Sequence, residues 1–179
     1  MKDEYMIRTE EFINRENKEV EGIKNTILRI YCDGACRGNP GKSGSGLAIY
    51  YPNTPNPTLL YGQYQEYGTN NMAELKALYK ALQIASKYKE ALIYSDSKYS
   101  IDCVINWAYG WKKNGWSKRG GEIKNLEIIK LTHNLYDKLK NVVTIKYVKG
   151  HSGIEGNELA DRMANLAIKE KILNYKECC

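Results

Sequence analysis

The chain has 179 residues, a formal net charge of +6, 42% hydrophobic residues and 27% charged residues, which are ordinary values for one globular domain with its own core. Its apolar runs are only a few residues long, far short of the roughly 20 that a membrane-spanning helix needs. The N-terminus is acidic where an export signal would be apolar, so we expect a cytoplasmic protein.

Residues 1–26 form a charged N-terminal extension, to which no function is assigned. A domain is expected over 27–170 and a short tail over 171–179. The first part of the domain is rich in β-formers, interrupted by a glycine-rich turn at 34–46 and a proline-rich loop at 52–58. Strands are therefore expected at 27–33, 47–51 and 59–67, as an antiparallel meander.

Helical periodicity begins at Asn70, after which apolar residues recur every three or four positions as far as about Tyr88. Two further strands are expected at 91–96 and 142–148. Further helices are expected up to about Ala108, over 125–139 and over 155–169. Three strands followed by alternating helices and strands predict an α/β fold with a five-stranded mixed sheet, three strands antiparallel and two parallel, flanked by helices.

The five cysteines fit no zinc template, and their odd number does not favour a disulfide framework. They are Cys32, Cys36, Cys103, Cys178 and Cys179. A redox or metal pair at Cys32 and Cys36 is disfavoured because no second ligand pair accompanies it. We expect reduced thiols, in keeping with a cytoplasmic location.

Four carboxylates stand where a core would not need them. Asp33 and Asp96 end predicted strands, while Glu74 and Asp161 lie near the starts of predicted helices, on faces shared with apolar residues. Taken singly, each has an ordinary explanation as a turn former, a helix cap or a partner of the helix dipole. Together they predict a site for hard divalent cations, which can activate water for phosphodiester cleavage.

The segment 107–121, WAYGWKKNGWSKRGG, contains all three tryptophans and no acid. Its cations are Lys112, Lys113, Lys118 and Arg119. A solvated lysine-rich surface is the plain alternative, but a local basic patch with aromatic residues is typical of a surface that binds a polyanion. Core packing competes as an explanation for Trp107, and less so for Trp111 and Trp116.

Four motifs resemble those of type 1 ribonuclease H, in the same order and at similar spacing over about residues 27–168. They are YCDGACRGNPGKSGSG at 31–46, TNNMAELKAL at 69–78, YSDSKYSI at 94–101 and VKGHSGIEGNELAD at 148–161. The resemblance implies the ribonuclease H-like fold. It also implies an endonuclease that hydrolyses the RNA strand of RNA–DNA hybrids and leaves 5′-phosphate and 3′-hydroxyl ends.

The resemblance places the catalytic, metal-binding carboxylates at Asp33, Glu74, Asp96 and Asp161, the four already singled out. It implies two Mg²⁺ ions, for which Mn²⁺ can substitute, and a monomeric enzyme. The flexible histidine of the family matches His151, in the loop GHSG, where it would shuttle a proton or help product release. Imidazole is a poor match for hard Mg²⁺, so we do not expect it to be a ligand.

The resemblance also implies two sets of substrate-binding residues. Those for the RNA strand are Cys36, Arg37, Asn39, Asn70 and Asn71. Those for the DNA strand and its phosphates are Thr69, Tyr99, Asn125, Trp107, Trp111, Lys112, Lys113 and Trp116, most of them in segment 107–121, which resembles the family's basic protrusion and is called the basic protrusion below. Turn formation and helix capping are alternative roles for Asn39 and Asn70. Tyr67 stands where some members have arginine, a departure in the DNA-phosphate pocket.

Three other interpretations compete with this one. A hybrid-binding protein with inactive chemistry would have lost a catalytic acid, and all four are present. A DNA-directed nuclease or integrase of the same fold would lack the GHSG loop together with the basic protrusion. A ribonuclease H domain of a reverse transcriptase is disfavoured only by the starting methionine and the fitted ends of the chain.

Overall fold

The computed structural model describes residues 27–178; the charged extension predicted at 1–26 and Cys179 lie outside the described residues. Six strands form one mixed sheet in the order β5-β4-β1-β2-β3-β6. The strands are β1 (Leu28–Arg37), β2 (Gly41–Tyr50), β3 (Thr58–Gly68), β4 (Ala91–Ser95), β5 (Val143–Tyr147) and β6 (Lys176–Glu177). β4 pairs parallel with β1 and β5, and the remaining pairs are antiparallel.

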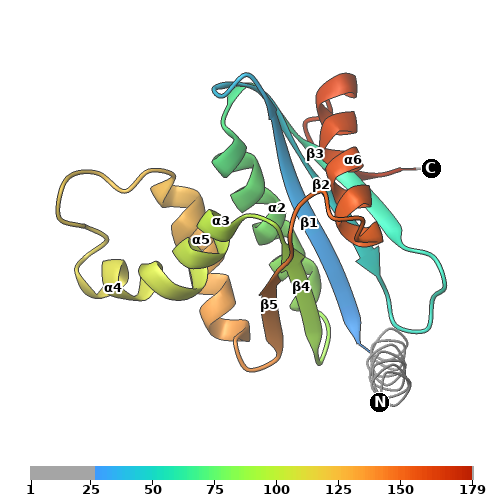
Figure 1. Cartoon of the computed structure of the whole chain (residues 1–179). Coiled ribbons are helices and arrows are strands. Elements are labelled where there is room, and N and C mark those ends of the chain that lie inside the picture. Colours follow the sequence, from blue (N-terminus) through green and yellow to red (C-terminus); the bar gives the residue numbers. More distant parts are fainter. Residues whose placement is uncertain (1–26, 179) are drawn as a thin grey trace, which may run out of the picture.

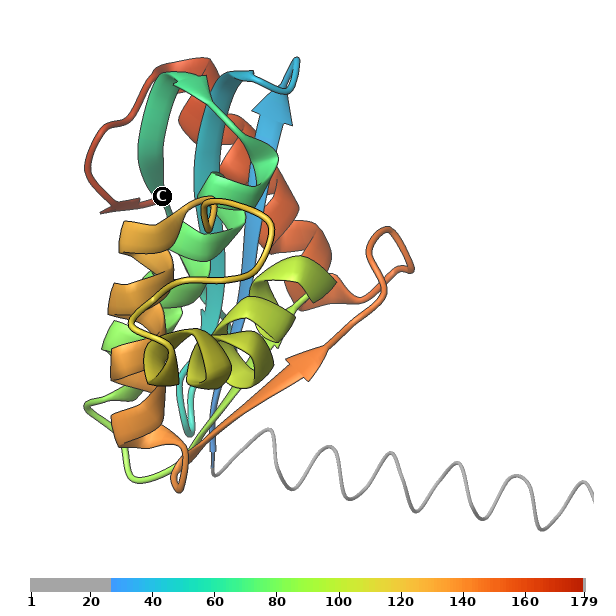
Figure 2. The ribbon, with the colours of Figure 1, turned by 90° about the vertical axis from the view of Figure 1, so that its left-hand side faces the viewer.

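Helices cover both faces of this sheet (Figures 1 and 2). The main ones are α2 (Asn70–Ala85), α5 (Leu126–Leu139) and α6 (Glu155–Glu170). α2 packs on one face, with α5 outside it, while α6 packs on the other face against β1, β2 and β3. A short series of helices follows β4: α3 (Lys98–Asp102), the π-helix η1 (Cys103–Trp107) and α4 (Ala108–Lys113), the last of which lies within the basic protrusion.

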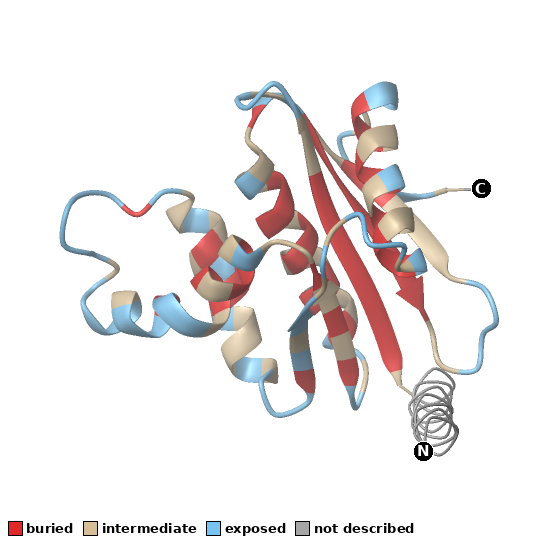
Figure 3. Cartoon of the chain, viewed as in Figure 1, coloured by how far each residue is buried: buried red, intermediate tan, exposed pale blue. Residues whose placement is uncertain are grey.

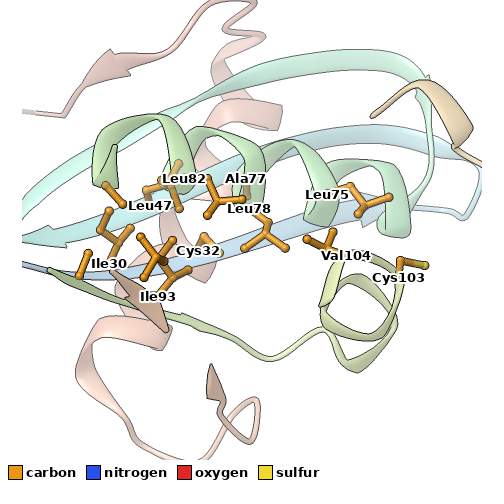
Figure 4. Packing of buried hydrophobic residues seen from close by; sticks show 14 of the residues in the cluster. Ile30, Cys32, Leu47, Leu75, Ala77, Leu78, Leu82, Ile93, Cys103 and Val104 are labelled. Carbon is orange, nitrogen blue, oxygen red and sulfur yellow. The ribbon is translucent and has the colours of Figure 1, made fainter. Parts of the chain in front are cut away.

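The principal core lies between the sheet and α2 (Figure 4), and in Figure 3 the buried residues follow β1, β2 and this helix. Leu75, Leu78 and Leu82 are fully buried, as the helical periodicity predicts, and they meet Ile30 and Ile93 from the sheet. Smaller clusters fill the space under α6. Two independently packed helices thus hold the central strands from opposite sides.

The α/β fold and its mixed sheet are confirmed, and three details differ from the sequence-based expectation. The glycine-rich segment 34–46 is mostly extended, because β1 and β2 continue through it as a hairpin and only Gly38–Pro40 form the turn. The helix expected to end near Ala108 continues to Lys113. The sheet has a sixth strand, formed by the tail: β6 pairs with β3 at Leu60 and Tyr61.

No helix within residues 27–178 has both the length and the apolar character needed to cross a membrane. Among the cysteines of this range, Cys32, Cys36 and Cys103 are free thiols.

Candidate active site

The parallel register of β1 and β4 brings Asp33 and Asp96 together. Cys32 pairs with Ser95 at the end of this ladder, so the next residue on each strand is an aspartate. Asp96 follows the last residue of β4, as predicted. Asp33, however, does not end its strand: β1 runs on to Arg37, paired with β2 alone. The site therefore lies where β4 stops beside a longer strand.

Two glycines allow the helices that carry the other two acids to approach the sheet. A Cβ atom on Gly34 would lie 2.4 Å from the backbone nitrogen of Glu74, and one on Gly46 would lie 2.3 Å from the carbonyl oxygen of Ala160. Both distances are shorter than real Cβ contacts. Glycine at these positions lets α2 bring Glu74, and α6 bring Asp161, close to the end of β4. Asp161 lies in the second turn of its helix, so first-turn dipole stabilisation does not explain it.

The four acids line one open cleft of about 450 Å³. Its walls are Asp33, Gly34, Ala35, Cys36, Asn70, Glu74, Asp96, Ser97, Gly150, His151, Asp161 and Asn165. Carboxylate oxygens of Asp33, Glu74 and Asp96 all lie within 4.8 Å of one another. Asp161 lines the cleft but lies outside this tight group, so three of the four predicted ligands are gathered closely and the fourth flanks them.

Burial makes this group of acids electrostatically unfavourable without a cation. Asp33 and Glu74 are each only 4% exposed. Burial raises the pKa of Asp33 to about 8, although a hydrogen bond with Glu74 opposes the shift, and the charges of Asp96 and Asp161 add to it. Burial first, and then the charge of Asp33, raise the pKa of Glu74 well above its usual range.

The donor set fits a divalent cation. Oxygen Oε2 of Glu74 is buried and has no hydrogen-bond partner among the described residues, which is costly for a carboxylate unless a cation contacts it. Oxygen-only ligands are the set that hard ions such as Mg²⁺ prefer, and no cysteine thiol belongs to the group. Asp33, Glu74 and Asp96 could therefore hold such an ion, with Asp161 beside them.

We expect the metal-free protein to become more stable when Asp33 is replaced by asparagine. The folded-state pKa of about 8 lies above the unfolded value of about 3.9, so the stability contributed by the protonated carboxyl is complete below about pH 4 and lost as pH rises to about 8. In EDTA, Asp33→Asn should exceed the wild type by at least about 1 kcal/mol at pH 8 and by much less at pH 4. Urea unfolding at both pH values measures this, and a constant difference would contradict it.

Two asparagines on α6 support the acids, and the sequence analysis missed both. The buried side chain of Asn157 donates to Oδ2 of Asp96 at 3.2 Å. Asn165 donates to Oδ1 of Asp161 at 3.3 Å. Asn157, Asp161 and Asn165 are spaced by four residues, so they form one polar stripe beside the buried apolar face of the helix. That spacing is a signal that the sequence already contained.

His151 lines the cleft from an exposed loop between β5 and α6. The loop approaches the acids closely, because a Cβ atom on its neighbour Gly150 would lie 2.8 Å from Oδ2 of Asp96. The histidine backbone has φ 51°, a left-handed conformation that a non-glycine residue adopts seldom. The imidazole therefore lies at the mouth of the cleft, outside the tight group of carboxylates.

The residues expected to contact RNA gather around the turn between β1 and β2. Cys36 and Asn70 line the cleft, whereas Arg37, Asn39 and Asn71 are exposed and lie outside its walls. Asn39 accepts a hydrogen bond from the backbone nitrogen of Asn70 at 3.2 Å, which ties the turn to the start of α2. The N-cap of α2 is Thr69, not Asn70: its hydroxyl accepts from the Met72 nitrogen at 3.2 Å.

Apart from Thr69, which is the N-cap of α2, the residues expected to contact DNA lie on the α5 side of the molecule. Asn125 Nδ2 donates to the Tyr99 hydroxyl at 3.1 Å, so these two are brought together. Lys112 and Lys113 are exposed. The tryptophans reverse the expectation about packing: Trp107 is 48% exposed, whereas Trp111 and Trp116 pack against the core. The reason is that α4 continues past Ala108 and turns Trp111 inward. Tyr67 is 86% exposed and leaves its position open to solvent.

Comparison with known proteins agrees with this geometry. The family model described as RNase H matches residues 25–169, which is most of the chain. The chain belongs to the ribonuclease H family. It is therefore a ribonuclease H-type hydrolase. The protein named Ribonuclease H from Francisella tularensis subsp. novicida (strain U112) is 41% identical over 155 residues, covering 86% of this chain and 98% of that protein. Ribonuclease H from Francisella philomiragia subsp. philomiragia is 40% identical over 148 residues, covering 82% and 93%.

Solved structures of ribonucleases H share the fold. LC9-RNase H1, a type 1 RNase H with the type 2 active-site motif, has a TM-score of 0.70 at 22% identity, with 86% of this chain and 78% of that chain covered. The PFV RNase H domain has a TM-score of 0.67 at 24% identity, covering 84% and 98%. LC11-RNase H1, solved in complex with RNA/DNA hybrid, has a TM-score of 0.56 at 23% identity, covering 80% and 98%.

Proposed function

We propose that this ribonuclease H hydrolyses the RNA strand of RNA–DNA hybrids with two divalent metal ions, and leaves 5′-phosphate and 3′-hydroxyl ends. The observation that carries the proposal is the cluster of Asp33, Glu74 and Asp96, whose ligand oxygens lie within 4.8 Å and whose burial needs positive charge. The family relationship and the solved complex of LC11-RNase H1 with a hybrid support the substrate.

The four acids and His151 occupy different places around the proposed metal ions. When bound, the metal ions supply an activated water and charge stabilisation for the leaving oxygen. Asp33 and Glu74 form the buried floor of the cleft, and Asp96 is held towards them by Asn157. Asp161 is less buried and shares its carboxylate with Asn165, so it can adjust as the substrate enters. His151 stands at the mouth of the cleft, where it could accept or return a proton.

Four reactions with labelled RNA test the activity directly. The RNA is supplied in a hybrid, in duplex RNA, as a single strand, and in the hybrid with EDTA. We expect cleavage of the first alone, and its restoration by added Mg²⁺ or Mn²⁺. Labelling the RNA at either end and comparing the products with marker ladders shows which end carries the phosphate. Cleavage in EDTA, or equal cleavage of duplex RNA, would overturn the proposal.

Strand choice is proposed to depend on Cys36, Arg37, Asn39, Asn70 and Asn71. An asparagine side chain can donate and accept at once, as recognition of a 2′-hydroxyl requires. These residues extend from the cleft wall to its rim, so they would contact more than one nucleotide. A duplex with one embedded ribonucleotide should be a poor substrate; cleavage as fast as that of a full hybrid would contradict this assignment.

We expect His151→Ala to lower turnover, and to leave the Mg²⁺ concentration for half-maximal activity unchanged. The physical reason is that the imidazole can transfer a proton or help product release, while the carboxylates alone bind the ions. Titrating Mg²⁺ at saturating hybrid measures both quantities. A large rise in the required Mg²⁺ would identify His151 as a ligand instead.

A monomeric state and a cytoplasmic location belong to the same proposal. The free thiols of Cys32, Cys36 and Cys103 are consistent with a reducing compartment. Light scattering coupled to size-exclusion chromatography tests the first, and cell fractionation the second.

A further inference from the structure

His133 lies on α5, beneath the basic protrusion. It belongs to none of the four motifs and does not line the cleft. Its side chain is fully buried. Nδ1 lies 2.7 Å from the carbonyl oxygen of Val104. Because a carbonyl only accepts, Nδ1 donates this hydrogen bond. Nε2 is buried and has no hydrogen-bond partner among the described residues. A buried polar group that is half satisfied calls for an explanation beyond packing.

The Val104 carbonyl belongs to the π-helix η1, which connects the core to the basic protrusion. Val104 itself is buried and points into the core near Leu75 (Figure 4). Short π-helices are rare and occur frequently at functional sites. The hydrogen bond from His133 therefore fixes the segment at which the chain leaves the core and enters the basic protrusion.

The imidazole ring also supports two aromatic residues of the basic protrusion. The ring of Tyr109 meets it edge-on at 4.5 Å between centroids, and that of Trp116 does so at 6.0 Å. Trp116 has φ 60°, a strained conformation that persists only where surrounding contacts hold it. Those contacts include the His133 ring and the Lys130 ammonium, 5.7 Å from the centre of the indole. The backbone nitrogen of Trp116 also donates to the Trp111 carbonyl at 2.6 Å.

Neighbouring residues of α5 add contacts along the same line. Asn134 accepts from Lys112 at 3.2 Å, and Asp137 accepts from the Tyr109 hydroxyl at 2.9 Å. Figure 2 shows α5 running beside α4 and the loop that follows it. Among these residues of α5 that contact the basic protrusion, His133 alone is fully buried and contacts both the π-helix and the two aromatic rings.

We propose that His133 is the positioning residue that holds the basic protrusion in the orientation needed to bind the hybrid. The proposal rests on the proposed function, since it concerns the surface that binds the hybrid and not the chemistry.

Two substitutions separate the two interactions of His133. His133→Phe keeps a ring for Tyr109 and Trp116 and removes the donor to Val104. His133→Asn keeps a donor at the δ position and removes the ring. Thr132→Val is the matched control: Thr132 is equally buried on the same helix, but its hydroxyl donates at 2.6 Å to the Ile128 carbonyl of that helix.

All three tryptophans of the chain lie in the basic protrusion, so tryptophan fluorescence and near-ultraviolet circular dichroism report on its setting without any substrate. We expect both His133 variants to change these spectra, to keep the far-ultraviolet spectrum, and to raise the KM for a hybrid at least about fivefold while kcat stays within about twofold. Thr132→Val should alter neither the tryptophan spectra nor KM.

Unchanged tryptophan spectra and KM in folded His133 variants would overturn the proposal and reduce His133 to a core residue. A fall in kcat at saturating hybrid with KM unchanged would overturn it as well, because the effect would then be on the cleft. Failure of the proposed function is distinguishable: the wild type would not cleave hybrid, yet the spectra would still show whether His133 sets the basic protrusion.

Discussion

Asp33→Asn should lower the rate of hybrid cleavage in Mg²⁺ at least about 100-fold, because it removes a negative charge from the centre of the metal-binding group. The side chain is 4% exposed and forms a hydrogen bond with Glu74, so its charge lies inside the buried part of the cleft. Asparagine retains the oxygen that accepts from the Gly34 nitrogen at 2.9 Å, so the backbone there should not move. Single-turnover cleavage of a labelled hybrid measures the loss.

The matched control is Asp102→Asn, which removes an aspartate of α3 that is outside the cleft and accepts from Asn106 at 3.0 Å. This variant should cleave at the wild-type rate. Asp33→Asn should also lose most of the stabilisation that Mg²⁺ gives the wild type, since a ligand that binds only the folded state raises its stability. Near-normal activity of folded Asp33→Asn would refute the metal mechanism.

Replacing Lys112, Lys113, Lys118 and Arg119 with alanine should weaken hybrid binding at least about tenfold at low salt. Each cation that binds a phosphate releases counterions, so removing one such cation should reduce the slope of log affinity against log salt by about 0.9. Lys112 is partly occupied by Asn134, so the slope should fall by about 3 rather than by the full value for the four cations. Affinity measured at several salt concentrations gives both numbers.

Turnover at saturating hybrid should change little in this variant, because interactions that are equal in the ground and transition states affect mainly KM. Stability should hold too, since all four side chains are exposed. Replacing Lys87 and Lys89, exposed lysines just after α2, with alanine is the control for loss of positive charge alone. An unchanged salt slope, or a collapse of turnover, would show that the basic protrusion is not a binding surface.

Periodicity and local composition predict most of this fold. The spacing of Leu75, Leu78 and Leu82 identified α2 and its buried face, and the strand ends identified Asp96 as a ligand candidate. The sequence could not show that β1 continues past Asp33, because the glycines that read as a turn are there to admit α2 and α6. A local pattern of glycines can indicate either a turn or the close packing of a helix on a strand. The sequence alone does not distinguish the two, because helix packing depends on the tertiary structure.

The buried polar residues that hold Asp96 and the π-helix were harder to predict than the acids. Asn157 and His133 are buried, and their partners Asp96 and Val104 lie in distant segments of the chain, so no local spacing pairs them. The packing of the tryptophans in the basic protrusion was predicted wrongly for a similar reason. Trp111 and Trp116 alternate with lysines in sequence, yet the extra turn of α4 and the support of α5 place them against the core.

The cleft is built from residues that span the chain from Asp33 to Asp161, and its last acid arrives only with α6. A chain still attached to the ribosome lacks that helix until synthesis has passed Glu170. The hairpin of β1 and β2 would already be available by then, but with the α6-facing side of Gly46 uncovered. Synthesis therefore delivers the basic protrusion before Asp161, and the set of four acids is complete only once α6 has been made.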